Sequence, residues 1–465
     1  MISVTKAERA LRDIGAADIY FDVLNTFRSI FPNESMLQFV RAPGRVNLIG
    51  EHTDYNGLPV LPMAINREIV IAFSSDPKPF IELISTAEYL TCNFSMSADI
   101  PHYEIGQWGN YAKAGAQAIW QWTAKHQPEL LPLKGFRGCL GGTIPPGSGL
   151  SSSSALVVAI AVALVAVNDL KIGKLELSDL LAKGERYVGT EGGGMDQTVS
   201  IMAEERKALK IDFFPLRTHP VPLPANCVFV VANSMISAQK TGNARLAYNM
   251  RVAECKLGME MLLHDSHLQS KTTALLKEFS VIPDWQNILD SLPDGPFSLT
   301  EIAAYTGLTL DDLRHKCLQK YEADSITLPG CFYPKERCRH VLTEGERVER
   351  AVGAMKRGDI AALGILMNES HNSCALDYQI SCPELDYLVS VLRSNGAVGA
   401  RLTGAGFGGC AVALVKSSDV EMLINGVWNA YYKTYLSERG INTPTDRDQV
   451  LFVCSPVNGA GIVSL

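Results

Sequence analysis

Apolar residues recur along the start of the chain at the three- and four-residue spacing of an amphipathic helix. The repeat runs from Lys6 to Phe31 and ends before Pro32, which predicts a helix there with a break at Gly15. From Gln38 onward the pattern changes to short runs rich in β-branched and aromatic residues, which are typical of strands. The expected strands are Phe39–Val40, Val46–Ile49, Ile65–Phe73 and Ile81–Ile84.

The middle of the chain alternates helical patterns with strand-like runs. We expect a helix at Trp108–Lys125, a strand at Phe136–Leu140 and a long helix at Ser151–Leu170. The apolar run inside that helix, Ala155–Val167, is too short to cross a bilayer, which needs about 20 residues. The order of helices and strands has no regular strand–helix–strand repeat, which favours an α+β fold over a doubly wound parallel sheet.

Three prolines between Arg217 and Cys227 remove backbone donors and favour extended structure. We therefore predict a domain boundary here, which divides the chain into residues 1–218 and 219–465. The second part is expected to begin with a strand at Val228–Ala232 and to contain a helical insert around residues 262–339.

Composition and charge narrow the class of protein. The chain has 465 residues, a length typical of two or three domains, and its net charge is −7. It has no run of Lys or Arg, so nucleic acid and anionic membranes are excluded as expected partners. The first residues lack the pattern of a signal peptide, and the 11 cysteines include no CxxC pair. We therefore expect a cytoplasmic protein with reduced thiols.

A glycine- and serine-rich stretch, Gly147–Ala155, directly precedes the long predicted helix. Glycines let backbone N–H groups approach an anion, and the start of a helix adds free donors and a favourable dipole. The stretch therefore fits a phosphate-binding loop, while a serine-rich helix cap explains its composition equally well. No lysine follows the glycines, so neither the P-loop nor the GxGxxG pattern is matched.

The stretch Arg45–Tyr55 flanks a short apolar core with Arg, Glu, His and Asp side chains. Such a group of donors and acceptors suits a polyhydroxylated ligand. Taken alone, the stretch fits a solvated strand end better than a binding site. His52 and Asp54 offer only two candidate metal ligands, which argues against a metal site.

Two further glycine-rich stretches accompany these. In Glu191–Gln197, three glycines place Asp196 on a backbone that can approach a ligand, so Asp196 is a candidate base. An aspartate after glycines is also a common turn or helix-cap residue. Gly404–Cys410 leads into an apolar strand at Ala411–Val415, and a tight glycine turn is its alternative interpretation.

Together and in this order, these stretches resemble the galactokinase branch of the GHMP small-molecule kinase family. GRVNLIGEHTDY at Gly44–Tyr55 is similar to its sugar motif, GSGLSSSSA at Gly147–Ala155 to its ATP-phosphate loop, and LTGAGFGGC at Leu402–Cys410 to its third glycine motif. The resemblance covers most of the chain and is weakest in the first 35 residues and in Leu262–Arg339. It implies a two-domain α+β fold, with an N-terminal domain like domain 2 of ribosomal protein S5 and a ferredoxin-like C-terminal domain that carries the helical insert.

The resemblance also implies roles for individual residues. Asp196 takes the position of the catalytic aspartate, and Arg45 that of the arginine that stabilises the phosphoryl-transfer transition state. Whether Asp196 removes a proton or only orients the sugar hydroxyl stays open. The other implied positions are Glu51, His52, Asp54, Gly193 and Tyr248 for the sugar, Trp108, Gly147, Gly149, Ser151, Ser152 and Ser153 for ATP, and Ser153 and Glu185 for Mg²⁺.

The implied reaction transfers a phosphoryl group from ATP to the anomeric hydroxyl of α-D-galactose, which gives galactose 1-phosphate and ADP. Tyr248 favours galactose, because the N-acetylgalactosamine kinases, which are the enzyme alternative, have phenylalanine at this position. A non-catalytic sensor of galactose and ATP that acts through a partner protein is a further alternative. It is disfavoured because both Gly149–Ala155 and Asp196 are intact. We expect a monomer.

Overall fold

The computed structural model describes the chain except residues 88–90, 105, 190–191, 238–243, 267–274 and 320–327. Its strands are β1 (Ile2–Ser3), β2 (Met36–Asn47), β3 (Pro62–Asp76), β4 (Phe80–Ser85), β5 (Cys92–Ser95), β6 (Gly135–Gly142), β7 (Lys207–Asp212), β8 (Arg217–Pro222), β9 (Cys227–Asn233), β10 (Gly399–Thr403), β11 (Cys410–Lys416), β12 (Leu451–Cys454) and β13 (Gly461–Ile462).

The α-helices are α1 (Val4–Asp13), α2 (Asp18–Ile30), α3 (Gly109–His126), α4 (Ser152–Val167), α5 (Lys174–Gly184), α6 (Met195–Met202), α7 (Ala244–Asp265), α8 (Leu276–Ser280), α9 (Trp285–Ser291), α10 (Leu299–Thr306), α11 (Leu310–Leu313), α13 (Pro334–Arg357), α14 (Ile360–Leu376), α15 (Pro383–Ser394), α16 (Val420–Val427) and α17 (Leu436–Glu438). Short 3-10 or π-helical segments are η1 (Asp54–Asn56), η2 (Pro128–Leu130), η3 (Glu185–Val188), η4 (Arg314–Leu318), η5 (Trp428–Tyr435) and η6 (Arg447–Gln449).

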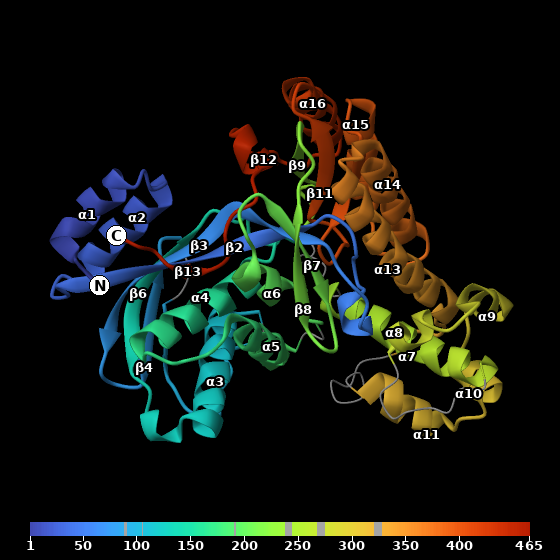
Figure 1. Ribbon diagram of the computed structural model, residues 1–465, viewed down its shortest axis with the longest axis horizontal. Helices are drawn as coiled ribbons and strands as arrows, with labels where there is room; N and C mark the ends of the chain where they lie inside the picture. Colours follow the sequence, from blue (N-terminus) through green and yellow to red (C-terminus); the bar gives the residue numbers. More distant parts are fainter. Residues whose placement is uncertain (88–90, 105, 190–191, 238–243, 267–274, 320–327) are drawn as a thin grey trace.

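A seven-stranded mixed sheet forms the first half of the molecule. Its strands follow the order β1-β2-β3-β6-β4-β5, and β13 pairs with β2. Helices α3 to α6 lie below this sheet, while α1 and α2 cover its other face at the end that holds both termini (Figure 1). The predicted break in the first helix is confirmed, since α1 ends at Asp13 and α2 begins at Asp18.

Helix α4 is the central helix of the N-terminal half. Ten of its residues are buried, and its residues are apolar on all sides except in the first turn. A helix without a polar face has to be covered on all sides, here by the sheet and by its neighbours α3 and α6. Of the helices in the described part of the chain, none is long and apolar enough to span a membrane.

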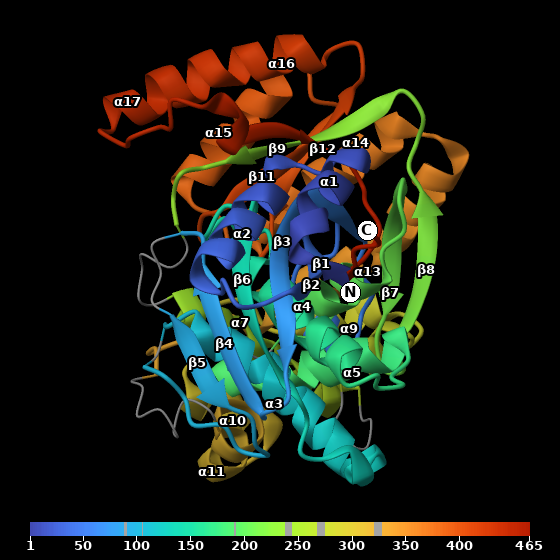
Figure 2. The same ribbon diagram turned by 90° about the vertical axis from the view of Figure 1, so that its left-hand side faces the viewer.

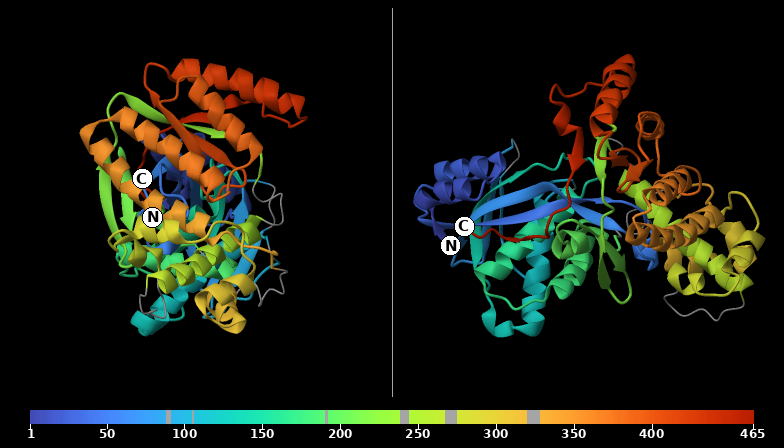
Figure 3. Two further views of the ribbon diagram at one scale, coloured as in Figure 1. Left: turned by 90° about the vertical axis from the view of Figure 1, so that its right-hand side faces the viewer. Right: turned by 45° about the horizontal axis from the view of Figure 1, so that its top comes forward.

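A four-stranded antiparallel sheet, in the order β10-β11-β9-β12, organises the second half. Helices α13 to α16 pack beside it, and α7 to α11 form a helical lobe at the end of the molecule opposite to α1 and α2 (Figure 3). This lobe packs in an apolar cluster built mainly from residues of α7 to α11 and α13, which also includes Leu58, Tyr378 and Leu402. The segment expected to be a helical insert therefore contains the helices α8 to α11, joined by turns and by a bridge between Phe297 and Phe332.

The chain returns to its first sheet at the end. Strand β13 pairs with Val40 and Arg41 of β2, and the two termini lie close together (Figure 2). The boundary predicted between residues 218 and 219 falls within β8, which pairs only with β7 in a small two-stranded sheet. The division into residues 1–218 and 219–465 stays a prediction.

Most predicted elements appear within a few residues of their expected bounds, and the exceptions have local causes. The strand predicted at Val46–Ile49 ends at Asn47. It ends there because Gly50 and His52 have φ angles of 102° and 60°, which turn the chain out of the sheet. All 11 cysteines are free thiols in the structure, as expected.

Candidate active site

The four glycine-containing stretches meet where β2 ends and where α4 and α6 begin. The backbone N–H of Arg45 donates to the carbonyl of Leu150 at 3.1 Å, which joins the sugar motif to the phosphate loop. The third glycine motif packs on the same loop so closely that a Cβ atom at Gly404 would lie 2.4 Å from the carbonyl oxygen of Gly149. Only glycine fits at position 404, because its φ is also positive at 89°.

The guanidinium of Arg45 makes a two-pronged ion pair with Asp196. Nε donates to Oδ1 at 2.8 Å and Nη2 donates to Oδ2 at 3.0 Å. Arg45 also donates to the carbonyl of Gly149, and the hydroxyl of Ser151 donates to Asp196 Oδ2. The arginine side chain is 6% exposed and the aspartate 23%, so Asp196 is the partner that a ligand can reach. The fork geometry fixes the carboxylate plane.

The phosphate loop leads directly into the first turn of α4. Gly147 and Gly149 have φ angles of 66° and 75°, and Ser151, just before the helix, is also left-handed at 62°. Ser152 and Ser153 open the helix and are partly exposed. The first N–H groups of a helix have no acceptor within it, so this turn offers donors and a positive dipole end to an anion next to Asp196.

Asp54 lies against the glycines that precede α6. Its Oδ2 accepts from the N–H of Gly193 at 3.0 Å. A Cβ atom at Gly193 would lie 2.4 Å from the backbone nitrogen of Tyr55, so the two segments approach as only glycine allows. Burial and, after it, the charge of Asp196 raise the pKa of Asp54 to about 6.

His52 is held through both of its ring nitrogens. Nε2 lies 3.2 Å from the carbonyl of Ala405, which can only accept, so Nε2 carries the proton. Nδ1 therefore accepts from the hydroxyl of Tyr55 at 2.7 Å, and the Tyr55 hydroxyl lies 2.7 Å from that of Tyr378. Burial lowers the pKa of His52 to about 3, so the ring is neutral. Its ring centroid is 4.9 Å from that of Tyr248.

Glu51 is almost completely buried, with 2% of its surface exposed. Its Oε1 accepts from the N–H of Gly404 at 2.7 Å and from Arg401 at 3.2 Å. The carboxylate therefore connects the sugar motif to the third glycine motif across a sequence separation of 353 residues.

Glu185, at the start of η3, lies beside the first turn of α4. It accepts from the hydroxyl of Ser154 at 2.9 Å and from the amide of Gln197 at 2.7 Å. Burial and the charge of Asp196 raise the pKa of Glu185 to about 7. Ser154, rather than Ser153, thus supplies the hydroxyl that touches this carboxylate. The predicted pairing of Ser153 with Glu185 stays a prediction.

The remaining predicted ligand residue is Trp108. It is the residue before α3, partly buried, and it packs against the apolar core of the N-terminal half. Among the described residues, no three His, Cys, Asp or Glu side chains come together as they would in a protein-only metal centre.

Comparison with known proteins agrees with this geometry. Residues 25–75 match the galactokinase galactose-binding signature, residues 110–204 the GHMP kinases N terminal domain and residues 351–434 the GHMP kinases C terminal region. A galactokinase of Dictyostelium discoideum is 33% identical over 96% of this chain and 94% of its own length. The chain belongs to the galactokinase family.

Other members of the galactokinase family support the assignment. A galactokinase of Saccharomyces cerevisiae is 31% identical over 91% of each chain. The crystal structure of a Lactococcus lactis galactokinase complexed with galactose superposes with a TM-score of 0.72, at 27% identity, over 94% of this chain and 97% of that one. The fold is therefore the two-domain α+β GHMP kinase fold, as expected. A mevalonate kinase of Methanococcus jannaschii, with a TM-score of 0.53 and 16% identity, shares the fold alone.

Several residues of this galactokinase-family site were not predicted from the sequence. Tyr55 lies within the sugar motif, and Arg401 precedes the third glycine motif as the one charged residue of the fully buried strand β10. That isolated charge is a signal that sequence reasoning could have used. Glu344 lies in helix α13 and Tyr378 in the loop after α14. The residues around them in the sequence do not predict that they contact Gly50 and Tyr55.

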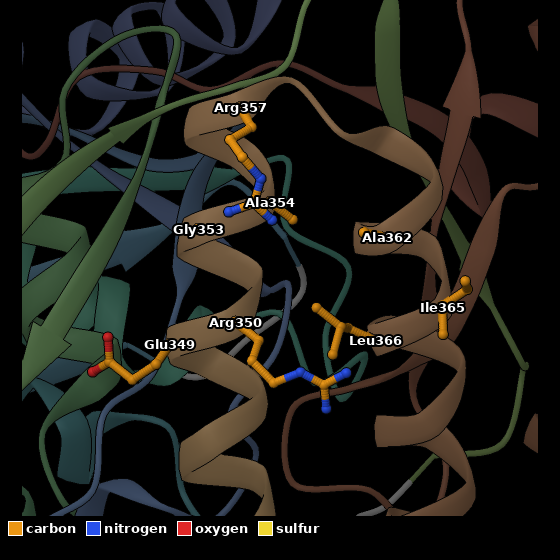
Figure 4. A pocket seen from close by; sticks show the side chains of 8 residues that line it. All are labelled: Glu349, Arg350, Gly353, Ala354, Arg357, Ala362, Ile365 and Leu366. Carbon is orange, nitrogen blue, oxygen red and sulfur yellow. The ribbon is translucent and has the colours of Figure 1, made fainter.

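A separate groove lies between α13 and α14, on the outside of the C-terminal half (Figure 4). It has a volume of about 510 Å³, and its walls include Arg350, Arg357, Ile365 and Leu366. None of its lining residues belongs to the site described above.

Proposed function

We propose that this chain transfers the γ-phosphoryl group of ATP to the anomeric hydroxyl of α-D-galactose, producing galactose 1-phosphate and ADP. The observation that carries the proposal is the fork of Arg45 on Asp196, placed between the phosphate loop and the sugar motif. A carboxylate held beside the start of α4 can meet a sugar hydroxyl on one side while the helix turn binds the phosphates on the other.

In the proposed mechanism, Asp196 Oδ1 or Oδ2 accepts the hydrogen bond of the anomeric hydroxyl. Arg45 keeps the carboxylate in place and offsets negative charge on the transferred phosphoryl group. The backbone donors of the phosphate loop, Gly147 to Ser153, hold the β- and γ-phosphates in line. No covalent intermediate is needed, because positioning and charge supply the catalysis.

We further propose that Mg²⁺ binds with ATP next to Glu185, with a hydroxyl from Ser153 or Ser154 beside it. The donor set fits, since hard oxygen ligands suit Mg²⁺, and this ion commonly takes one or two protein carboxylates together with substrate phosphates. Burial and the nearby charge of Asp196 raise the pKa of Glu185 to about 7, and a cation beside this carboxylate would lower it again. When bound, the ion would neutralise phosphate charge.

The test is ADP release coupled to a detector enzyme, with galactose and N-acetylgalactosamine compared at equal concentrations. We expect galactose to give the higher kcat/KM, in keeping with Tyr248. Asp196→Asn, which keeps the shape of the side chain, should lower kcat at least 100-fold. Asp179→Asn, at an exposed i,i+4 pair with Lys183 on α5, is the matched control and should change kcat by less than twofold.

Three outcomes would contradict the proposal. A higher kcat/KM for N-acetylgalactosamine would show that this sugar, and not galactose, is the substrate. Turnover retained in Asp196→Asn would show that Asp196 is not needed for catalysis. Sugar- and ATP-dependent binding of a partner protein without any turnover would favour the sensor. We also propose that the protein is a cytoplasmic monomer; the first residues, which lack the pattern of a signal peptide, support the location.

A further inference from the structure

A buried arginine, Arg401 in β10, connects the sugar motif to the helices of the C-terminal half. Its side chain is fully buried. Nη1 donates to the main-chain carbonyl of Asn47 at 3.0 Å and to Glu51 Oε1 at 3.2 Å. On the other side, Nε donates to the hydroxyl of Ser370 in α14 at 3.0 Å. The Arg401 guanidinium therefore contacts the main chain at the end of β2, the predicted sugar ligand Glu51 and helix α14 of the C-terminal half.

A buried glutamate in α13, Glu344, completes this connection. Its Oε1 accepts from the N–H of Gly50 at 2.8 Å and from the Ser370 hydroxyl at 2.5 Å, and it lies 4.0 Å from Arg401 Nη2. Burial would raise the pKa of Glu344, but the guanidinium of Arg347 and weaker contributions that include Arg401 lower it to about 2. The anion therefore persists at neutral pH and holds both Arg401 and the turn that carries Glu51.

The two oxygens of the Glu51 carboxylate have different surroundings. Oε1 receives hydrogen bonds from Gly404 and Arg401. Of the residues that the structure describes, none donates to Oε2. A carboxylate oxygen without a protein donor can accept a hydrogen bond from a ligand hydroxyl. The rotation of the carboxylate, and hence the direction of Oε2, is set by the two donors on Oε1.

We propose that Arg401 is a positioning residue for the sugar, which orients the Glu51 carboxylate so that Oε2 receives a hydroxyl of the bound galactose, with Glu344 and Ser370 keeping Arg401 in place. The inference rests on the proposed function, because galactose is the ligand it assigns to Glu51. Arg401 has no hydrogen bond to the described residues of the phosphate loop. Its loss should therefore weaken the sugar's binding and leave that of ATP unchanged.

The test compares Arg401→Lys with a matched control, Arg393→Lys. Lysine keeps the charge but loses the planar fork that reaches Asn47, Glu51 and Ser370 together. Arg393 is partly buried and donates to the carbonyl of Ala400 in the same strand at 2.8 Å, without contacting the site. We expect Arg401→Lys to raise the KM for galactose at least tenfold and to leave the KM for ATP within twofold. Arg393→Lys should leave both within twofold.

A double variant separates a role through Glu51 from a general loss of packing. The double variant carries both Glu51→Gln and Arg401→Lys. If Arg401 acts through Glu51, its galactose KM should be no higher than that of the worse of the two single variants. Multiplied effects, or equal rises in both KM values, would overturn the inference. Should circular dichroism show Arg401→Lys to be unfolded, Ser370→Ala removes one anchor of Arg401 with less change in volume. It should raise the galactose KM two- to fivefold, and an unchanged KM would overturn the inference.

Calorimetric titration with galactose distinguishes this inference from the proposed function. If the protein binds galactose more tightly than Arg401→Lys does but does not phosphorylate it, only the proposed function is contradicted. A chain that phosphorylates galactose with the same KM before and after Arg401→Lys contradicts the inference alone. A chain that binds no galactose contradicts both.

Discussion

Three carboxylates, those of Asp54, Glu185 and Asp196, share a small volume beside a single arginine. Arg45 is paired with Asp196, and the charge of Asp196 contributes to the raised pKa of each of the other two. Such crowding of like charge is unfavourable for folding but useful in a site that binds hydroxyls and cations. The free energy needed to ionise Asp54 and Glu185 in the folded protein should therefore make folding stability depend on pH.

Stability should fall as the pH rises from about 4 to about 7. Asp54 and Glu185 have folded-state pKa values of about 6 and 7, above the values of 3.8 and 4.5 for free side chains. The folded state therefore binds more protons than the unfolded state in this range, so deprotonation favours unfolding. Glu185→Gln removes the contribution of Glu185 and should raise the melting temperature at pH 8 more than at pH 5.

Thermal unfolding followed by circular dichroism at both pH values measures the effect. Glu421→Gln, at an exposed glutamate of α16, is the control and should change neither melting temperature. If Glu185→Gln shifted the melting temperature equally at pH 5 and pH 8, the assigned pKa would be wrong.

At the scale of elements, the site consists of the ends of helices and strands that glycines bring together. The start of α4 supplies backbone donors, the start of α6 supplies Asp196, and the turn after β2 supplies Glu51. Close backbone approach is possible only where a side chain is absent. The glycines before α6 and in the third motif therefore have a packing role as well as a conformational one.

Gly193→Ala should disrupt the sugar side of the site. Its Cβ atom would lie 2.4 Å from the backbone nitrogen of Tyr55 and 2.5 Å from the carbonyl carbon of Asp54, so η1 would have to shift. We expect the KM for galactose to rise at least tenfold. Steady-state kinetics measure this change. Gly173→Ala is the control, because nothing lies within 4 Å of a Cβ atom at Gly173. Equal kinetics for the two variants would argue against close packing at Gly193.

At the scale of the whole molecule, the end of the chain leaves the C-terminal half and packs against the end of α6 in the N-terminal half. After β12 the chain donates from Gly459 to the carbonyl of Ala203 at 2.8 Å and from Ala460 to that of Ser200 at 2.7 Å, at the end of α6. Val457 packs in the apolar cluster that contains Met195 and Val199 of α6. The orientation of α6, and with it Asp196, therefore depends on the C-terminal segment.

Deletion of residues 456–465 should lower the free energy of unfolding by about 3 kcal/mol, through lost valine burial and backbone hydrogen bonds. It should also lower kcat, because the end of α6 would lose two of its partners. Urea unfolding and initial rates test this, with deletion of the exposed residues Ser464 and Leu465 as the control. A stable variant with full kcat would show that α4, α5 and β2 hold α6 in place without the C-terminal segment.

The sequence by itself determined the local structure and the kinds of chemistry present. Hydrophobic spacing predicted α1 to α4 and the strands β2, β3, β4, β6, β9 and β11, because helix and strand periods depend on neighbouring residues. The glycine and serine composition before α4 predicted a phosphate loop, and the order of motifs indicated the family. Such features need no knowledge of distant parts of the chain.

Only the tertiary structure decided which side chains meet. Arg45 and Asp196 are 151 residues apart, and Arg401 and Glu51 are 350 residues apart. These pairs form because two sheets and their helices pack in one particular arrangement, and local periodicity carries no information about that arrangement. For the same reason the sequence named Glu51 and His52 as ligands but did not predict that Arg401, Gly404, Tyr55 and Ala405 hold them in place.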